Sequence, residues 1–176
     1  MVINYCGEKC FKIQSGQLSL VVDPLPRFKG DVALITSPWK AAAEEQWPPV
    51  AGQIYGPGEY EVKEIEVNGW PIGGGNTAYL AVIEEIRLCF LGDGGKDPKP
   101  EMLEKFGDID ILFAPAEITA KSVKQLNPKI VIPFYKKPDA LKSFLKEMDQ
   151  KTETQDKFVT KKKDLTTGTK VVVLKI

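Results

Sequence analysis

Short apolar runs separated by turn residues fill the first half of the chain. Val32 to Thr36 is continuous and apolar, which is typical of a strand buried on both faces. Gly7 and the Ser15-Gly16 pair interrupt the earlier runs where turns are expected. A short helix is predicted over Ala41–Gln46. The predicted strands are Val2–Tyr5, Cys10–Ile13, Leu18–Val22, Val32–Thr36, Glu59–Val62, Ile65–Val67, Thr77–Ile83 and Arg87–Leu91.

The spacing of apolar residues changes after Gly92, where helices begin to alternate with strands. Leu141, Phe144, Leu145 and Met148 recur at helical spacing on one face. The predicted elements are helices Pro98–Phe106, Thr119–Leu126 and Pro138–Met148, strands Ile109–Phe113, Lys129–Pro133 and Lys170–Lys175, and a polar loop over Lys151–Asp156. Strands followed by helices that return to strands indicate an α/β domain of two sheets with helices packed outside.

The length and composition favour one soluble domain. The chain has 176 residues, of which 43% are hydrophobic and 27% are charged. We therefore predict that residues 1–176 form a single domain around a substantial core. No apolar run approaches the ~20 residues needed to cross a bilayer. Glu8 and Lys9 lie where a signal peptide would need a continuous apolar core. Three cysteines, an odd number, fit a reducing compartment, so a cytoplasmic location is predicted.

The charges disfavour nucleic acid as a partner, as the lack of a long apolar run disfavours a membrane. Lysine plus arginine equals aspartate plus glutamate, at 24 each, so the chain lacks the basic excess of a nucleic-acid binder. The dense basic run Lys161-Lys162-Lys163 is interpreted as a solvated loop, with a weak anion or partner contact as the alternative. Neither nucleic acid nor a membrane is expected as a partner.

The absence of histidine limits the chemistry most. Histidine is the commonest transition-metal ligand and the commonest general acid–base near neutral pH, and the chain contains none. A Ser-His-Asp triad, a Cys-His pair and a histidine-based zinc site are therefore excluded by composition alone.

Several segments, taken in order, carry a family resemblance. The run Tyr5–Phe11, followed by Leu20–Pro24, resembles the opening of the metallo-β-lactamase-fold hydrolases, and most closely the branch of L-ascorbate-6-phosphate lactonase. In that branch a Gly-His-Ser-Cys-Phe run precedes an Asp-Pro turn, and here Glu8 replaces the histidine. Further similar segments, which extend the resemblance to about residue 146, are Val32–Thr36, Gly58–Val67, Leu91–Asp93 and Val131–Tyr135.

The resemblance implies both a fold and a degenerate site. The implied fold is the αββα sandwich, two mixed β-sheets flanked by helices, with the chemistry at one edge of the sheets. The family's His-x-His-x-Asp-His motif aligns with Ser37, Trp39, Ala41 and Ala42, and its third metal histidine falls near Gly73–Gly75. Asp93 matches the bridging aspartate, and Tyr135 lies near the final histidine position. Because a catalytic metal needs three or more nitrogen or oxygen ligands, neither metal nor cofactor is expected here.

Each candidate residue has a structural and a functional interpretation. Asp93 is expected to be a strand-end carboxylate that accepts backbone amides, rather than the remnant of a metal site. If it is buried, the Tyr135 hydroxyl, Ser37 or Lys40 is predicted to compensate its charge. Trp39 and Tyr135 are expected to fill the hollow that metals and substrate occupy in relatives, and the alternative is a pocket for an aromatic or sugar-like ligand.

Other motifs are interpreted as structural. Cys6, Cys10 and Cys89 could form a thiolate cluster, but free cysteine in apolar strand patterns behaves as a small hydrophobe. Gly73–Asn76 is expected to be a loop because the lysine and the strand–turn–helix context of a phosphate-binding loop are missing. Glu59 and Glu61 are predicted to face solvent.

Two functional hypotheses follow. The first is a non-catalytic binding or scaffold protein that associates with itself or with an active paralogue, its small-molecule ligand unspecified. The alternative is a divergent metal-dependent hydrolase of ester, lactone or phosphodiester substrates, whose site combines Asp93 with Asp23, Glu8 or Glu59. A nuclease-like nucleic-acid binder is a third reading, which the neutral charge disfavours.

Overall fold

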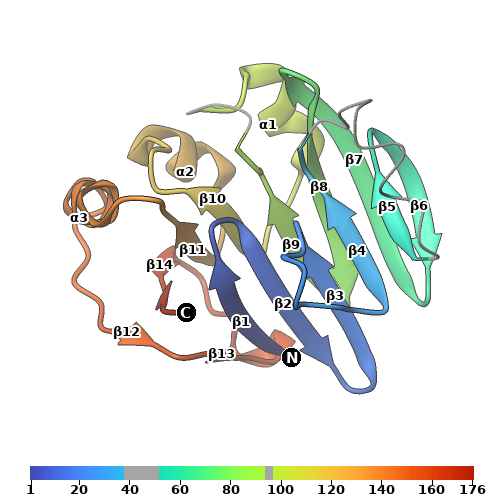
Figure 1. Ribbon diagram of the computed structural model, residues 1–176. Helices are drawn as coiled ribbons and strands as arrows, with labels where there is room; N and C mark the ends of the chain where they lie inside the picture. Colours follow the sequence, from blue (N-terminus) through green and yellow to red (C-terminus); the bar gives the residue numbers. More distant parts are fainter. Residues whose placement is uncertain (38–51, 94–96) are drawn as a thin grey trace.

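The computed structural model describes residues 1–37, 52–93 and 97–176, and its core is two mixed β-sheets packed face to face (Figure 1). The first sheet has the order β13-β1-β2-β3-β4-β5. Neighbouring strands are antiparallel from β13 to β3 and parallel from β3 to β5. Its strands are β1 Val2–Gly7, β2 Cys10–Ser15, β3 Leu18–Val22, β4 Val32–Ile35, β5 Gln53–Tyr55 and β13 Phe158–Val159.

The second sheet has the order β14-β11-β10-β9-β8-β7-β6. It begins as an antiparallel meander from β6 to β9 and continues with parallel pairs through β10, β11 and β14. Its strands are β6 Gly58–Val62, β7 Ile65–Gly73, β8 Asn76–Ile83, β9 Ile86–Phe90, β10 Ile111–Pro115, β11 Ile130–Phe134 and β14 Lys170–Val171. A small parallel pair joins β12 Thr154–Gln155 to β15 Val173–Leu174.

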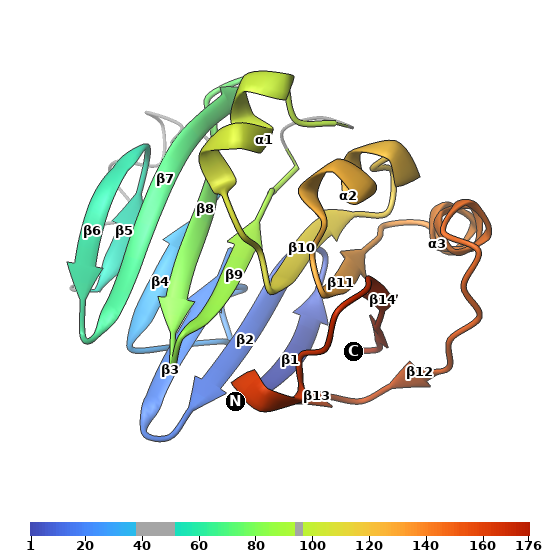
Figure 2. The same cartoon turned by 180° about the vertical axis from the view of Figure 1, so that it is seen from behind.

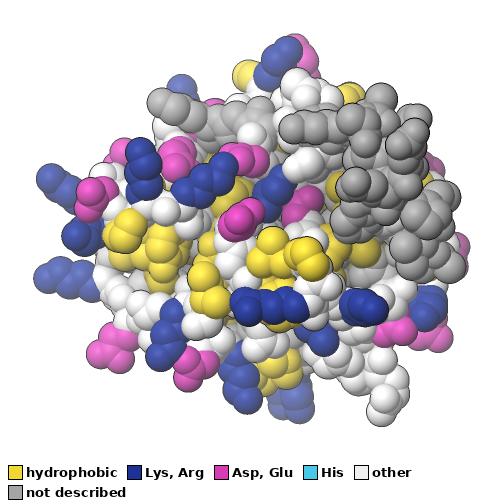
Figure 3. Space-filling view, viewed as in Figure 1, with side chains coloured by type: hydrophobic (Ala, Val, Ile, Leu, Met, Phe, Trp, Pro, Cys, Tyr) yellow, Lys and Arg dark blue, Asp and Glu magenta, His cyan; other side chains and the backbone are white. Residues whose placement is uncertain are grey.

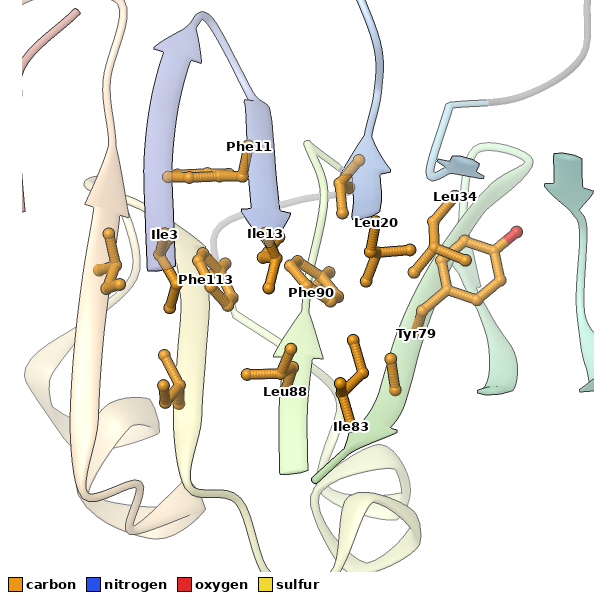
Figure 4. Packing of buried hydrophobic residues seen from close by; sticks show 14 of the residues in the cluster. Ile3, Phe11, Ile13, Leu20, Leu34, Tyr79, Ile83, Leu88, Phe90 and Phe113 are labelled. Atoms are coloured by element: carbon orange, nitrogen blue, oxygen red, sulfur yellow. The ribbon is translucent and has the colours of Figure 1, made fainter. Parts of the chain in front are cut away.

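The main core lies between the two sheets. Alternation along β1 to β3 turns Ile3, Phe11 and Leu20 inward, where they meet side chains of the second sheet such as Phe90 and Phe113 (Figure 4). The Phe113 ring lies 4.5 Å from Phe90 and 4.8 Å from Phe11, measured between centroids. The Phe11–Phe113 contact thus ties the two sheets together, and the Phe90–Phe113 contact joins β9 to β10 within the second sheet.

Helices cover the outer face of the second sheet (Figure 2). They are α1 Pro100–Phe106, α2 Ala120–Leu126 and α3 Pro138–Glu147. A short 3₁₀ turn, η2, spans Lys162–Asp164. The Thr119 hydroxyl accepts a hydrogen bond from the Ser122 amide and so caps α2. Two mixed sheets with helices outside confirm the predicted α/β sandwich class. The helix predicted over Ala41–Gln46 lies outside the described residues.

Near the C-terminus the structure differs from the sequence prediction in two places. The predicted loop Lys151–Asp156 contains strand β12, because Thr154 and Gln155 pair with Val173 and Leu174. The predicted strand Lys170–Lys175 is divided, since its first part pairs with β11 and its second with β12. Such short pairings depend on distant partners and leave no periodicity in the local sequence.

The face shown in Figure 3 mixes acidic and basic side chains, so no stripe of a single charge runs across it. Among the described helices, none has the length and apolar character needed to cross a membrane.

Candidate functional site

Three of the predicted site positions lie at the carboxyl ends of strands. Ser37 follows β4, Asp93 follows β9, and Tyr135 follows β11. The two sheets meet here, because the Thr77 amide at the start of β8 donates to the Thr36 carbonyl beyond β4 (2.9 Å). Trp39, Ala41 and Ala42 lie outside the described residues, as does Lys40.

A lysine ammonium group lies at the first of these positions. Lys9, in the turn between β1 and β2, donates a close hydrogen bond from Nζ to Ser37 Oγ. The same nitrogen lies 3.3 Å from Thr36 Oγ1 and 3.6 Å from Asp23 Oδ2. A cation supplied by the chain itself thus contacts Ser37, the first of the site positions predicted from the sequence resemblance.

Asp23 is the buried partner of this lysine. Its side chain is 8% exposed, and its oxygens accept hydrogen bonds from the Thr36 amide (2.9 Å) and the Thr36 hydroxyl (2.5 Å). Burial raises the pKa of Asp23 above its usual value, although Lys9 and Thr36 act in the opposite direction. The carboxylate therefore depends on Lys9 and Thr36 to stay ionised.

The local sequence explains how this cluster forms. Asp23 has a positive φ of 43°, an uncommon conformation that aspartate tolerates better than most residues. This turn is held by a hydrogen bond from the Asp23 amide to the Leu34 carbonyl at 2.8 Å. Asp23 thereby faces the end of β4, where Thr36 is fully buried.

Asp93 is an exposed ion-paired carboxylate. Its Oδ2 lies 2.7 Å from Lys136 Nζ, with side-chain exposures of 45% for Asp93 and 67% for Lys136. The predicted donors Tyr135 and Ser37 do not bond to it, because it is not buried and because Ser37 is bound to Lys9. The hydrogen bond from Lys136 to Asp93 raises the pKa of Lys136.

An exposed ion pair of this kind contributes little to stability. Replacing Lys136 by methionine is expected to change the free energy of unfolding by less than about 1 kcal/mol, because water screens both charges. Urea unfolding of the variant and the parent measures this. A loss of several kcal/mol would instead mean that Asp93 is a buried charge at the centre of the site.

Tyr135 lines a hollow beside this ion pair. The cavity of about 550 Å³ is bordered by Tyr5, Glu8, Tyr135, Lys136, Lys175 and Ile176. The Tyr5 hydroxyl donates to the Glu8 carbonyl at 2.7 Å, and the Tyr5 and Tyr135 rings lie 6.3 Å apart. Burial raises the pKa of Tyr5 to about 12, so its hydroxyl is a neutral donor at physiological pH.

The other candidate residues do not gather at this edge. Cys6 and Cys10 pack with Val21 on the outer face of the first sheet, whereas Cys89 is buried under the helices of the second. Glu59 and Glu61 are exposed on the edge strand β6, as predicted. Gly73 lies in the β7–β8 turn.

The donors at this edge do not fit a catalytic metal. Such a metal needs three or more histidine, cysteine or carboxylate ligands, and no group of three is found in the part of the chain that the structure describes. Trp39, Ala41 and Ala42 offer no metal-binding atom whatever their position. Of the two nearby aspartates, Asp23 is bound by Lys9 and Asp93 by Lys136.

Lys9 is the important residue that sequence reasoning missed. The sequence feature that could have indicated it is the lysine itself, which follows Glu8 in the tight turn before Cys10, at a position where the resembled branch has serine. A lone lysine in a turn normally faces solvent, and only the approach of Asp23 and Ser37 reveals its role.

Comparisons with known proteins agree on the fold. Residues 2–135 match the family model described as "Beta-lactamase superfamily domain". A structure from Thermotoga maritima, assigned as a candidate Zn-dependent hydrolase of the metallo-β-lactamase superfamily, is 25% identical with a TM-score of 0.80, covering 98% of this chain and 97% of that one.

Two further solved structures are similar at lower identity. The metallo-β-lactamase fold protein YhfI from Bacillus subtilis has a TM-score of 0.64 at 11% identity, covering 98% and 95% of the two chains. A metallo hydrolase from Ignicoccus hospitalis has a TM-score of 0.62 at 15% identity, covering 91% of this chain and 99% of that one. No curated protein matches this sequence.

Proposed function

The chain belongs to the beta-lactamase superfamily, and from that premise we propose that it is a non-catalytic member, a binding or scaffold protein in which a lysine replaces the metal. The observation that carries this proposal is the contact of the Lys9 ammonium group with Ser37, Thr36 and Asp23. A fixed positive charge there opposes the binding of a divalent cation by direct electrostatic repulsion.

The ammonium group can replace the charge of a metal but not its chemistry. It compensates the buried Asp23 and donates hydrogen bonds, so it can hold the ends of β3 and β4 in place. It has no open coordination position, and it can neither bind a carbonyl or phosphoryl oxygen as a Lewis acid nor generate hydroxide from bound water. The structural role of the site is thereby kept while metal-dependent hydrolysis is lost.

The proposed branch of the family, the location and the partner rest on the sequence. The Gly7–Phe11 run and the Asp23-Pro24 turn support descent from the branch that resembles L-ascorbate-6-phosphate lactonase. A cytoplasmic protein that pairs with itself or with an active paralogue remains our working hypothesis for location and partner.

A divergent hydrolase is the second candidate. It is favoured by the candidate Zn-dependent hydrolase from Thermotoga maritima, and by the hollow that brings Glu8 close to Tyr135 and Lys136. In this alternative, Asp93 would release the Lys136 ammonium group and bind a metal in its place. Against it, Asp23 is already bound by Lys9, and Glu59 projects from the far edge strand β6.

Metal content distinguishes the two candidates. Protein without a histidine tag, incubated with zinc, manganese and iron and then desalted, is expected to retain less than about a tenth of an equivalent of each metal, because too few ligands converge. Elemental analysis measures this directly. A stoichiometric metal that disappears in Asp93→Ala would overturn the proposal and establish a hydrolase with a rebuilt site.

A further inference from the structure

A second polar hollow lies at the opposite end of the second sheet, where β9, β10 and β11 begin. It has a volume of about 530 Å³ and is separate from the edge that carries Ser37, Asp93 and Tyr135. Its lining side chains with charges are Arg87, Asp108, Asp110, Lys129 and Lys162, and its uncharged polar ones include Gln125, Asn127 and Thr167.

At its base is Asp110, a carboxylate that is only 4% exposed. Lys129 Nζ lies 2.7 Å from Oδ1, while Lys162 Nζ (2.6 Å) and the Arg87 amide (2.9 Å) donate to Oδ2. Burial raises the pKa of Asp110, but the hydrogen bonds from Lys129, Lys162 and Arg87 outweigh it, and the net shift is downward. The carboxylate stays ionised and holds both lysines in place.

One carboxylate does not require two ammonium groups. Lys129 and Lys162 together bring two positive charges to the single charge of Asp110. Arg87 adds a third cation, held by its Nε donating to the Asp108 carbonyl at 2.5 Å. Asp108 supplies the second negative charge, so the charged lining residues carry a net charge of three minus two, or plus one.

The two lysine ammonium groups also have N–H donors that these contacts do not use. Of the three N–H donors of each ammonium group, Lys129 uses one for Asp110, and Lys162 uses two, for Asp110 and the Glu85 carbonyl. The lysine side chains are 34% and 41% exposed, so the remaining donors are accessible to a ligand. This arrangement differs from the solvated loop expected for Lys161–Lys163, because Lys162 is anchored on a buried acid.

We propose that this hollow binds a small phosphate-bearing anion between Lys129, Lys162 and Arg87. A phosphate group offers several acceptor oxygens and a charge near minus two, which match converging cationic donors. The volume of about 530 Å³ leaves room for a substituent beyond the phosphate group itself. The site is independent of the proposed function, since it does not involve the Lys9 cluster.

The test is a titration of the full chain with inorganic phosphate and with phenyl phosphate at constant ionic strength, followed by amide chemical shifts in NMR. Lys129→Gln and Lys162→Gln are each expected to weaken binding roughly tenfold or more, because a charge-assisted hydrogen bond is lost. Each variant leaves Asp110 one ammonium partner, so the fold is retained, which the dispersion of the same spectra checks. Tighter binding of phenyl phosphate would identify a monoester site, and equal binding a site for free phosphate.

Lys163→Gln is the matched control. It removes a charge from the same basic run, but Lys163 does not line the hollow, so binding is expected to stay within about twofold of the parent. The proposal is overturned if phosphate shifts no more signals than chloride does. It is equally overturned if Lys163→Gln weakens binding as much as the other two variants, since diffuse surface charge would then explain the effect.

Discussion

Replacing Lys9 by methionine is expected to lower the free energy of unfolding by about 2–3 kcal/mol at neutral pH. The substitution keeps an apolar stem of similar length but removes the cation next to Asp23, whose carboxylate is 8% exposed. A buried charge without a partner is strongly destabilising. The expected loss lies at or below the lower end of the usual range of about 3–5 kcal/mol because Lys9 itself is 21% exposed. Urea unfolding at pH 7 measures the loss.

A second substitution and the pH dependence test whether the unpaired Asp23 charge causes the loss of stability in Lys9→Met. In Lys9→Met/Asp23→Asn the charge is gone, so most of the lost stability is expected to return. Because the folded-state pKa of Asp23 is raised, its ionised form costs stability above that pKa, and protonation on acidification removes the cost. The difference in the free energy of unfolding between Lys9→Met and the parent should therefore narrow as the pH falls toward about 4, because a carboxylate with a raised pKa begins to be protonated above the usual aspartate value.

Lys12→Met is the control for Lys9→Met. Lys12 lies on the same hairpin and forms no ion pair in the part of the chain that the structure describes, so the expected change is within about 0.5 kcal/mol. A Lys9→Met protein as stable as its parent at neutral pH would show that the ion pair does not hold the strand ends together, and would remove the main support for our functional proposal.

Replacing Gly92 by alanine is the second substitution with a large expected effect, a loss of about 2–5 kcal/mol in the free energy of unfolding. Gly92 has a φ of +62°, which costs an L-residue roughly 1–2 kcal/mol. An added Cβ would lie 2.6 Å from Thr36 Oγ1 and 2.7 Å from Thr36 Cβ, and overpacking of this kind costs about 1–3 kcal/mol. Thr36 is fully buried and binds Asp23, so it has little room to move.

Gly16→Ala separates the backbone cost of the positive φ from the steric cost of the clash with Thr36. Gly16 has a similar φ of +56°, but a Cβ there would meet no atom within 4 Å, so only the backbone cost of roughly 1–2 kcal/mol is expected. Thermal or urea unfolding of both variants gives the difference, which is the steric cost at Thr36. Equal losses in the two proteins would contradict the close approach of Gly92 to the end of β4.

The Lys9 cluster offers a physical reason why a metal could be lost without loss of the fold. The carboxylate of Asp23 is buried at the junction of β3 and β4, where it requires a positive charge. A lysine on the neighbouring hairpin supplies that charge permanently. In the non-catalytic member that we propose, the cation is part of the chain, so the charge of Asp23 is compensated without a bound ion.

The sequence by itself determined the class of fold and the chemistry that is excluded. Short apolar runs such as Cys10–Ile13, bounded by turn residues, depend only on neighbouring residues, and they predicted the strands. The absence of histidine is a property of composition and holds in any conformation. The candidate positions Ser37, Asp93 and Tyr135 came from the resemblance of segments, taken in order along the chain, to the motifs of a known family.

Only the tertiary structure decided which charges meet. Lys9 and Ser37 are 28 residues apart, and Lys162 and Asp110 are 52 residues apart. These contacts arise where strand ends from distant parts of the chain converge, and their short range makes them depend on sheet register and turn conformation. The local sequence around a lysine in a turn does not show whether the side chain faces water or a buried carboxylate, so the partners in the Lys9 and Asp110 clusters could not be predicted from it.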